Sequence, residues 1–186
     1  MIVGYSLAHN QLFAPVFAES LSLLPRVKEL GFINDESEAI IGQKCLNAEY
    51  QKGGLMGKMD KILYTHLSKD FKYYFASISL ANKTSLNFVT NSGYKKVYAT
   101  ETRAYFIIDI KPSELNSDSY ETKKPDGTEI HYRFATTGDI AELRQMNSEW
   151  MKENRNDLSH GYLAAMFSED NWKYMIDRKW VVIAEV

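Results

Sequence analysis

Cysteine is almost absent from this sequence, since Cys45 is the one thiol in 186 residues. A single thiol cannot build an internal disulfide framework, so a reducing compartment, the cytoplasm, is expected. The four histidines are scattered along the chain without the spacing of metal ligands. No metal site is therefore expected.

Neither sign of charge dominates. The chain carries 22 basic and 24 acidic residues without a basic stripe, which argues against nucleic acid or an anionic membrane as a partner. No apolar run approaches the length of a membrane span, and the apolar start, residues 1–5, lacks the basic residues of a signal peptide. A hydrophobic share of 45% suits one globular domain of this length.

Apolar runs and helical periods alternate along the chain. Strands are expected at residues 1–8, 39–48, 72–80, 94–100, 103–111, 130–134 and 180–186. Helices are expected at residues 18–31, 54–69, 83–92, 136–150 and 160–177, the last as one helix or two short ones. Pro25 should bend or break the first helix, and Thr136 opens a Thr-x-x-Asp capping signal. Residues 112–128 are polar and have no apolar period, so they are predicted to be a linker.

The most informative stretch is residues 50–59, where an expected strand is followed by glycines and then by a helical period. Glycines let backbone N–H groups approach a ligand, and a helix N-terminus attracts negative charge, so this order predicts a phosphate or pyrophosphate site. It is not a Walker A loop, because Met59 stands where that loop has Ser or Thr. The Gly-x-Gly-x-x-Gly fingerprint of dinucleotide sites is absent as well.

The pattern does resemble the Gln/Arg-x-x-Gly-x-Gly/Ala signature of the GCN5-related N-acetyltransferase (GNAT) superfamily. Gln51 and Gly54 fit it, while Met56 replaces the usual Gly or Ala. About thirty residues downstream, the stretch from Asn82 to Tyr94 resembles the second landmark of that family: Asn-x-x-Ser/Ala, a short helix, then Gly-Phe/Tyr. Within it, Asn82 suits a helix N-cap and Gly93 suits a left-handed helix end.

This resemblance implies an α/β protein of the α+β type, with a mixed, mainly antiparallel central sheet flanked by helices. It implies acetyl-CoA as co-substrate and an amine as acceptor. Backbone N–H groups of Leu46 or Asn47 would stabilise the thioester oxygen. The residues that the resemblance assigns to the rest of coenzyme A are Gln51, Lys52, Gly53, Gly54, Met56, Gly57, Asn82 and Ser85.

The catalytic groups are less defined. In the family a tyrosine seven residues after the Asn often protonates the leaving thiolate, and here that position is Val89. Another group or water would have to serve instead, or the protein is a poor catalyst. Weak candidates for chemistry are Gln43, Cys45, Asp157 and His160. Gln43 could equally line the acceptor site or be a core amide, whereas Cys45 is expected to be a buried thiol that packs as a small apolar residue. Asp157 and His160 fall in the loop that, by the resemblance, borders the acceptor amine.

The two halves of the family occur in reversed order. Residues 129–186 resemble its first half, and residues 1–111 resemble its second, which carries the predicted cradle; residues 112–128 join them. A circular permutant, a dimer that swaps half-domains, and a piece of a tandem double-domain protein all remain open. In the first two, strand 1–8 should lie antiparallel to strand 180–186, with Met1 near Val186.

The sequence leaves two main functional hypotheses and a third, structural one. One is an acyl-CoA-dependent N-acyltransferase, most simply an N-acetyltransferase for a small amine or a protein amino group. The other is a non-catalytic acyl-CoA-binding or partner-binding module, and a structural half-domain in a larger assembly is a third reading. Resemblance in fold does not by itself establish catalysis.

Overall fold

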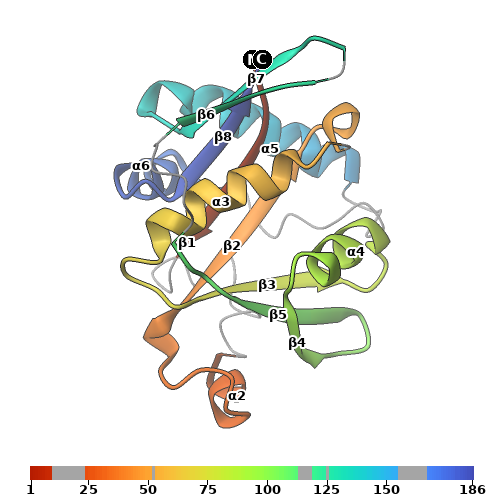
Figure 1. The fold of residues 1–186 in the computed structure, drawn as a ribbon, viewed down its shortest axis with the longest axis vertical. Helices are drawn as coiled ribbons and strands as arrows, with labels where there is room; N and C mark the ends of the chain where they lie inside the picture. The colour runs from red at the N-terminus through yellow and green to blue at the C-terminus, as the bar shows by residue number, and fades with distance from the viewer. Residues whose placement is uncertain (10–23, 52, 113–118, 125, 155–166) are drawn as a thin grey trace.

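The structure, a computed structural model, describes residues 1–9, 24–51, 53–112, 119–124, 126–154 and 167–186. The described residues form a sheet of eight strands in the order β4-β5-β3-β2-β1-β8-β7-β6 (Figure 1). The strands are β1 (Ile2–His9), β2 (Ala39–Leu46), β3 (Tyr73–Ser79), β4 (Lys95–Ala99), β5 (Arg103–Asp109), β6 (Ser119–Lys123), β7 (Glu129–Phe134) and β8 (Val181–Glu185). The helices are α2 (Leu24–Glu29), α3 (Leu55–Leu67), α4 (Lys83–Asn91), α5 (Ile140–Asn154) and α6 (Glu169–Asp177). Single turns of 3₁₀-helix occur at η2 (Glu36–Glu38), η3 (Ala48–Tyr50) and η4 (Thr137–Asp139).

The sheet is mixed but mainly antiparallel. Six of its neighbouring pairs are antiparallel and one pair, β2 with β3, is parallel. A parallel pair needs a crossover, and α3 provides it. The predicted fold class, a mixed and mainly antiparallel sheet flanked by helices, is confirmed.

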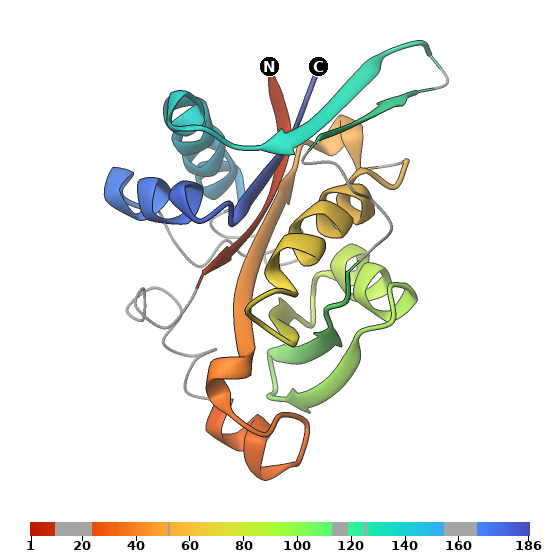
Figure 2. The ribbon, with the colours of Figure 1, turned by 60° about the vertical axis from the view of Figure 1, so that its left-hand side comes forward.

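Helices cover both faces of the central strands (Figure 2). The side chains of successive residues in a strand point to opposite faces of the sheet, so two neighbouring residues of β1 identify the helices on each face. Tyr5 makes an edge-to-face ring contact with Trp172 of α6 at 5.7 Å and receives a hydrogen bond from Asn147 of α5. Its neighbour Ser6 donates to Asp60 of α3 at 2.9 Å. Thus α5 and α6 lie on one face and α3 on the other.

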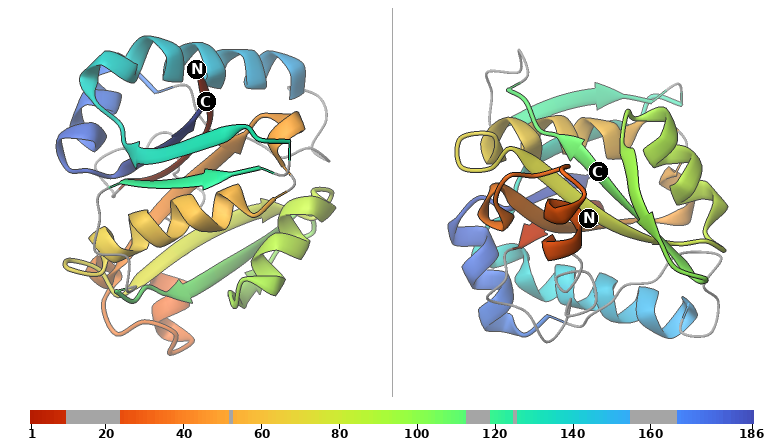
Figure 3. Two further views of the ribbon diagram at one scale, coloured as in Figure 1. Left: turned by 45° about the horizontal axis from the view of Figure 1, so that its top comes forward. Right: turned by 90° about the horizontal axis from the view of Figure 1, so that it is seen from below.

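The first and last strands of the chain pair with each other. β1 and β8 are antiparallel, with Tyr5 opposite Ile183 and Ser6 opposite Val182. A bulge between Ile2 and Gly4 shifts the register once. The two chain ends lie side by side (Figure 3). The expected antiparallel pairing is confirmed, and in this structure it forms within one chain.

Local capping signals lie where the sequence predicts them. Asp139 accepts hydrogen bonds from the backbone N–H and the hydroxyl of Thr136, at 2.7 and 2.9 Å. The Arg133 guanidinium lies between two carboxylates, donating to Asp139 and to Glu185 of β8 at 2.8 Å each. Hydrogen bonding to Arg133 is the main cause that lowers the pKa of Asp139 to about 2. One carboxylate therefore caps a helix and helps to hold β7 against β8.

One expectation needs correction. The predicted linker 112–128 contains a strand, β6, which forms a hairpin with β7. β6 lies at the edge of the sheet, where polar side chains are tolerated and oppose aggregation, so an apolar alternation is missing from its sequence. Of the expected helix 18–31, the described part contains α2, in which Pro25 is the second residue, while residues 18–23 lie outside the described residues.

Candidate functional site

The two parallel strands diverge. β2 and β3 pair only between Ala39–Ile41 and Tyr73–Phe75, although β2 continues to Leu46 and β3 to Ser79. Figure 1 shows them running apart toward α4. Beyond Ile41, the edge of β2 that faces β3 has no strand partner in the described sheet.

The direction of the β2 backbone decides which N–H groups face this divergence. Asn47 donates its N–H to the Val3 carbonyl of β1 at 2.9 Å. In an antiparallel ladder the N–H groups alternate in direction, so those of Lys44 and Leu46 point away from β1 and toward β3. Of the two backbone candidates for a thioester oxygen, Leu46 faces the divergence, while the N–H of Asn47 is already used.

The predicted glycine turn follows β2 and the single turn η3, and it lies at the start of α3. Gly53 and Gly54 have φ of 114° and 76°, a left-handed conformation that suits glycine, and Gly54 is the N-cap without a side-chain hydrogen bond. The first hydrogen bond of the helix runs from Lys58 N–H to the Gly54 carbonyl at 3.2 Å. The N–H groups of residues 55–57 precede it and therefore have no acceptor within the helix.

The space beside these N–H groups is open. A Cβ added at Gly54 or Gly57 would meet no atom within 4 Å. Gln51 is exposed, whereas Met56 packs against the core and Lys52 lies outside the described residues. The geometry can accept a pyrophosphate, which needs convergent backbone donors at a helix N-terminus.

The second landmark has its expected local structure. The Asn82 side chain caps α4 by accepting the Ser85 N–H at 2.9 Å, and Gly93 follows the helix with φ of 82°. Because the Asn82 oxygen is used in the cap, its amide nitrogen is the end that remains for a ligand. Val89 is buried, with 3% of its surface exposed, and offers no proton.

A buried polar cluster fills the space between the diverging strands, and the sequence reasoning did not find it. The Lys44 ammonium on β2 donates to the Asp60 carboxylate at 2.5 Å and to the Tyr64 and Tyr94 hydroxyls at 3.0 Å each. The two hydroxyls are also hydrogen-bonded to each other. The sequence does place a lysine in an apolar strand and an aspartate on the apolar face of α3. Nothing in the sequence shows that these two residues form an ion pair.

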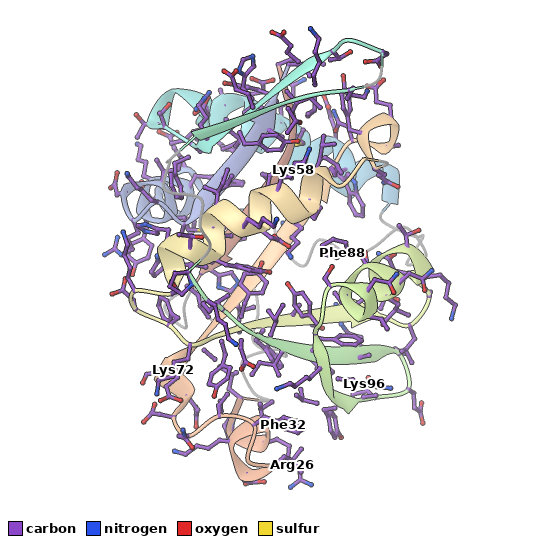
Figure 4. The ribbon with its side chains drawn as sticks, viewed as in Figure 1. Arg26, Phe32, Lys58, Lys72, Phe88 and Lys96 are labelled. Atoms are coloured by element: carbon purple, nitrogen blue, oxygen red, sulfur yellow. The ribbon has the colours of Figure 1, made fainter. Side chains whose placement is uncertain are left out.

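Aromatic rings enclose this ammonium. Lys44 Nζ lies 5.1 to 5.4 Å from the ring centroids of Tyr64, Tyr74, Phe88 and Tyr94. Figure 4 labels Phe88 on α4, on the side of that helix nearest to β2. Burial by itself lowers the pKa of the ammonium, but Asp60 and Tyr94 outweigh this, so the pKa of Lys44 is raised. Burial is also the main cause that raises the pKa of Tyr64 and of Tyr94.

Tyr74 stands at the point where the strands separate. From β3 it reaches across β2 and donates its hydroxyl to the Leu7 carbonyl of β1 at 3.0 Å. It passes directly over Gly42, where an added Cβ would lie 1.6 Å from the Tyr74 hydroxyl oxygen. Gly42 is therefore required for this close approach of a tyrosine to the backbone.

Gln43 and Cys45 lie on the opposite face of β2, toward α5 and α6. The Gln43 amide donates to the Tyr5 hydroxyl at 2.9 Å, and Asn147 donates to the same hydroxyl at 3.0 Å. The other end of the Gln43 amide, its oxygen, is buried and has no hydrogen-bond partner among the described residues. Burial raises the pKa of the Cys45 thiol to about 12, which keeps it protonated and unsuited to a nucleophilic role. Asp157 and His160 lie outside the described residues.

The described part of the chain contains no group of three or more His, Cys, Asp or Glu residues that could hold a metal ion. None of its helices has the length and apolarity needed to cross a membrane.

Comparisons with known proteins add little to this geometry. No protein-family model matches the chain, and no curated protein matches it. Among solved structures it is similar to RimL, described as a ribosomal L7/L12 alpha-N-protein acetyltransferase in an apo crystal form, with 11% identity. The match covers 58% of this chain and 94% of that one, with a TM-score of 0.36. At that TM-score the likeness carries no argument about activity.

Proposed function

We propose that this protein is an acyl-CoA-dependent N-acyltransferase, most simply an N-acetyltransferase that moves acetyl from acetyl-CoA to an amine. The observation that carries the proposal is the way three features adjoin one another. β2 diverges from its parallel partner β3, and the chain that leaves β2 runs through η3 into a left-handed glycine turn and the open N-terminus of α3. This arrangement offers an anion site and an unpaired strand edge next to each other.

Each part of the co-substrate then has residues to meet it. The pyrophosphate lies against the N–H groups of residues 55–57, beside Gln51, Lys52 and Gly53. The pantetheine arm follows the free edge of β2, where the Leu46 N–H faces the thioester oxygen and can stabilise the negative charge that develops there. Asn82 and Ser85 border the arm from α4.

The acceptor amine is proposed to approach from the face of β2 that carries Gln43. The buried oxygen of the Gln43 amide, which has no partner in the described part of the chain, gives this side of the strand a hydrogen-bond acceptor. Asp157 and His160 remain candidates for the base that deprotonates the amine. Cys45 is excluded from a covalent role by its burial and raised pKa.

We also propose that the domain is a circular permutant of the GNAT arrangement. Residues 129–186 supply its first half and residues 1–111 its second, with 112–128 between them. The pairing of β1 with β8 within one chain supports this proposal, since the two strands would be consecutive in the usual order.

A specific observation favours a second function, a non-catalytic acyl-CoA-binding module. Val89 is buried where the resemblance expects a proton donor, and Lys44 with its partners fills the space between the strands. Such a module would bind the thioester without transferring the acyl group.

One pair of measurements separates the two functions. Calorimetry with coenzyme A, acetyl-CoA and adenosine 3′,5′-diphosphate measures binding, and release of the free thiol over a panel of amines measures transfer. Binding together with amine-dependent thiol release supports the acyltransferase. Binding without release on any amine supports the module, and absence of binding contradicts both.

A further inference from the structure

The Lys44 ammonium has all its donors satisfied. An ammonium carries three N–H groups, and the structure gives it three oxygen acceptors, on Asp60, Tyr64 and Tyr94. The Lys44 side chain is 16% exposed, so the cluster lies next to the surface. A ligand that enters between the strands can therefore meet this ammonium only by taking the place of one acceptor.

The three acceptors come from two sides. Asp60 and Tyr64 lie on α3, which follows β2 along the chain after the single turn η3. Tyr94 comes from the other side, between α4 and β4, and β4 is joined to β3 through β5. The hydrogen bonds of Tyr94 to Lys44 and to Tyr64 thus bridge the divergence of β2 and β3.

We infer that Lys44 is the hydrogen-bond donor to a carbonyl oxygen of the acyl-pantetheine arm, and that the Tyr94 hydroxyl holds this oxygen's place when no arm is inserted. The inference rests on the proposed function, because it takes the arm to lie along the free edge of β2. Neither the turn at Gly54 nor the cap at Asn82 requires a lysine at this position.

The charges in the cluster define the class of group that Lys44 accepts. Asp60 already balances the ammonium, so a second carboxylate would be left uncompensated inside the protein. A neutral oxygen such as an amide or thioester carbonyl replaces a tyrosine hydroxyl without a change in charge. The arm is expected to displace Tyr94 and not Asp60, because Asp60 forms an ion pair with Lys44 and accepts a hydrogen bond from Ser6.

The position of Lys44 on β2 agrees with this role. Lys44 and Leu46 are two residues apart, so their side chains share one face, and their backbone N–H groups face the same edge, roughly 7 Å apart. An extended acyl-pantetheine carries a thioester carbonyl and amide carbonyls along its length. One carbonyl can meet the Leu46 N–H while another meets the Lys44 ammonium.

The test uses two variants with opposite expected effects. Tyr94→Phe removes the competing hydroxyl and leaves a buried N–H of Lys44 without an acceptor, so the dissociation constants of coenzyme A and acetyl-CoA should fall by about fivefold, the value of one net hydrogen bond. Lys44→Met combined with Asp60→Asn removes the donor without stranding a buried charge, and the dissociation constants should rise by about tenfold. Tyr98→Phe and Lys61→Met, both exposed positions outside the cluster, are the matched controls and should change neither constant.

A second measurement uses the parent protein, so it does not depend on the folding of a variant. Acetyl-pantetheine has no adenine absorbance. It should produce a tyrosine ultraviolet difference spectrum in the parent protein, because the Tyr94 hydroxyl loses its hydrogen bond from the Lys44 ammonium. An unchanged spectrum, or unchanged or weaker binding in Tyr94→Phe, overturns the inference while the proposed function stands. If the parent protein binds no coenzyme A derivative, the proposed function fails, and the role of Lys44 fails with it.

Discussion

The first and last residues of the chain are hydrogen-bonded to each other. The Met1 ammonium donates to the Val186 carbonyl at 3.0 Å, and the Val186 N–H donates to the Met1 carbonyl at 3.0 Å. Since β1 and β8 are also paired, the two ends have the geometry of an open hairpin. The ends lie at the surface, where a connection can be added without disturbing the core.

Joining these ends should preserve the fold. A short glycine-rich connection from Val186 to Met1, with a new opening between Asp126 and Gly127, removes only the turn hydrogen bonds of the β6–β7 hairpin. We expect circular dichroism and coenzyme A affinity to match those of the parent, with a melting temperature lower by a few degrees, equivalent to about 1 kcal/mol. A chain opened between Ile41 and Gly42, in the centre of the sheet, should not fold. Loss of the native spectrum in the first chain would contradict the hairpin geometry of the ends.

A charge at the start of α3 should separate stability from binding. Gly57 is the third residue of this helix and has open space beside it, so Gly57→Glu gains about 0.5 kcal/mol in helix propensity and a few tenths more from the helix dipole. The same carboxylate repels a pyrophosphate, and coenzyme A affinity should fall at least tenfold. Gly57→Gln is the neutral control. It should gain similar stability in urea unfolding and lose less affinity for coenzyme A. Equal affinity in the parent and both variants would contradict a pyrophosphate site at this turn.

Glycine at position 42 should be far less replaceable. In Gly42→Ala the new Cβ would lie 1.6 Å from the Tyr74 hydroxyl oxygen and 2.5 Å from the Leu7 carbonyl oxygen. Either Tyr74 or the strand must move, and we expect a loss of about 3 kcal/mol in the free energy of unfolding by urea. Adding Tyr74→Leu should recover part of the loss by clearing the larger obstacle. Gly57→Ala is the control, and a similar outcome for both alanine variants would show that Tyr74 does not lie over Gly42.

Acid should weaken the junction between β7 and β8. The pKa of Asp139 is lowered to about 2 by hydrogen bonding to Arg133, so its ionised form stabilises the folded state at pH values above the unfolded pKa, near 4. This contribution, about 1 to 2 kcal/mol, is lost as the pH falls from about 4 toward 2. Asp139→Asn should be less stable than the parent at pH 7 by that amount, and the difference should vanish near pH 2. A difference in unfolding free energy that stays constant with pH would exclude the ion pair as its source.

Features built from neighbouring residues were readable in the sequence. The Asn82 cap, the left-handed Gly93, the Thr136–Asp139 cap and the glycine turn at residues 53–54 each satisfy hydrogen-bonding or backbone demands within a few residues. The adjacency of β1 and β8 was predicted as well, from the order in which family-like segments occur. Local chemistry fixes such features because the groups involved meet in any fold that contains the segment.

Tertiary structure decided the interior of the site. Lys44, Asp60 and Tyr94 lie up to fifty residues apart and become partners because the strands diverge and a buried ammonium must find oxygen atoms. The direction of the Asn47 N–H depends on which neighbour β2 takes, and β6 is a strand because β7 offers it an edge. None of these is visible in a local pattern, since each depends on which distant segment supplies a hydrogen-bond partner for a group that would otherwise lack one.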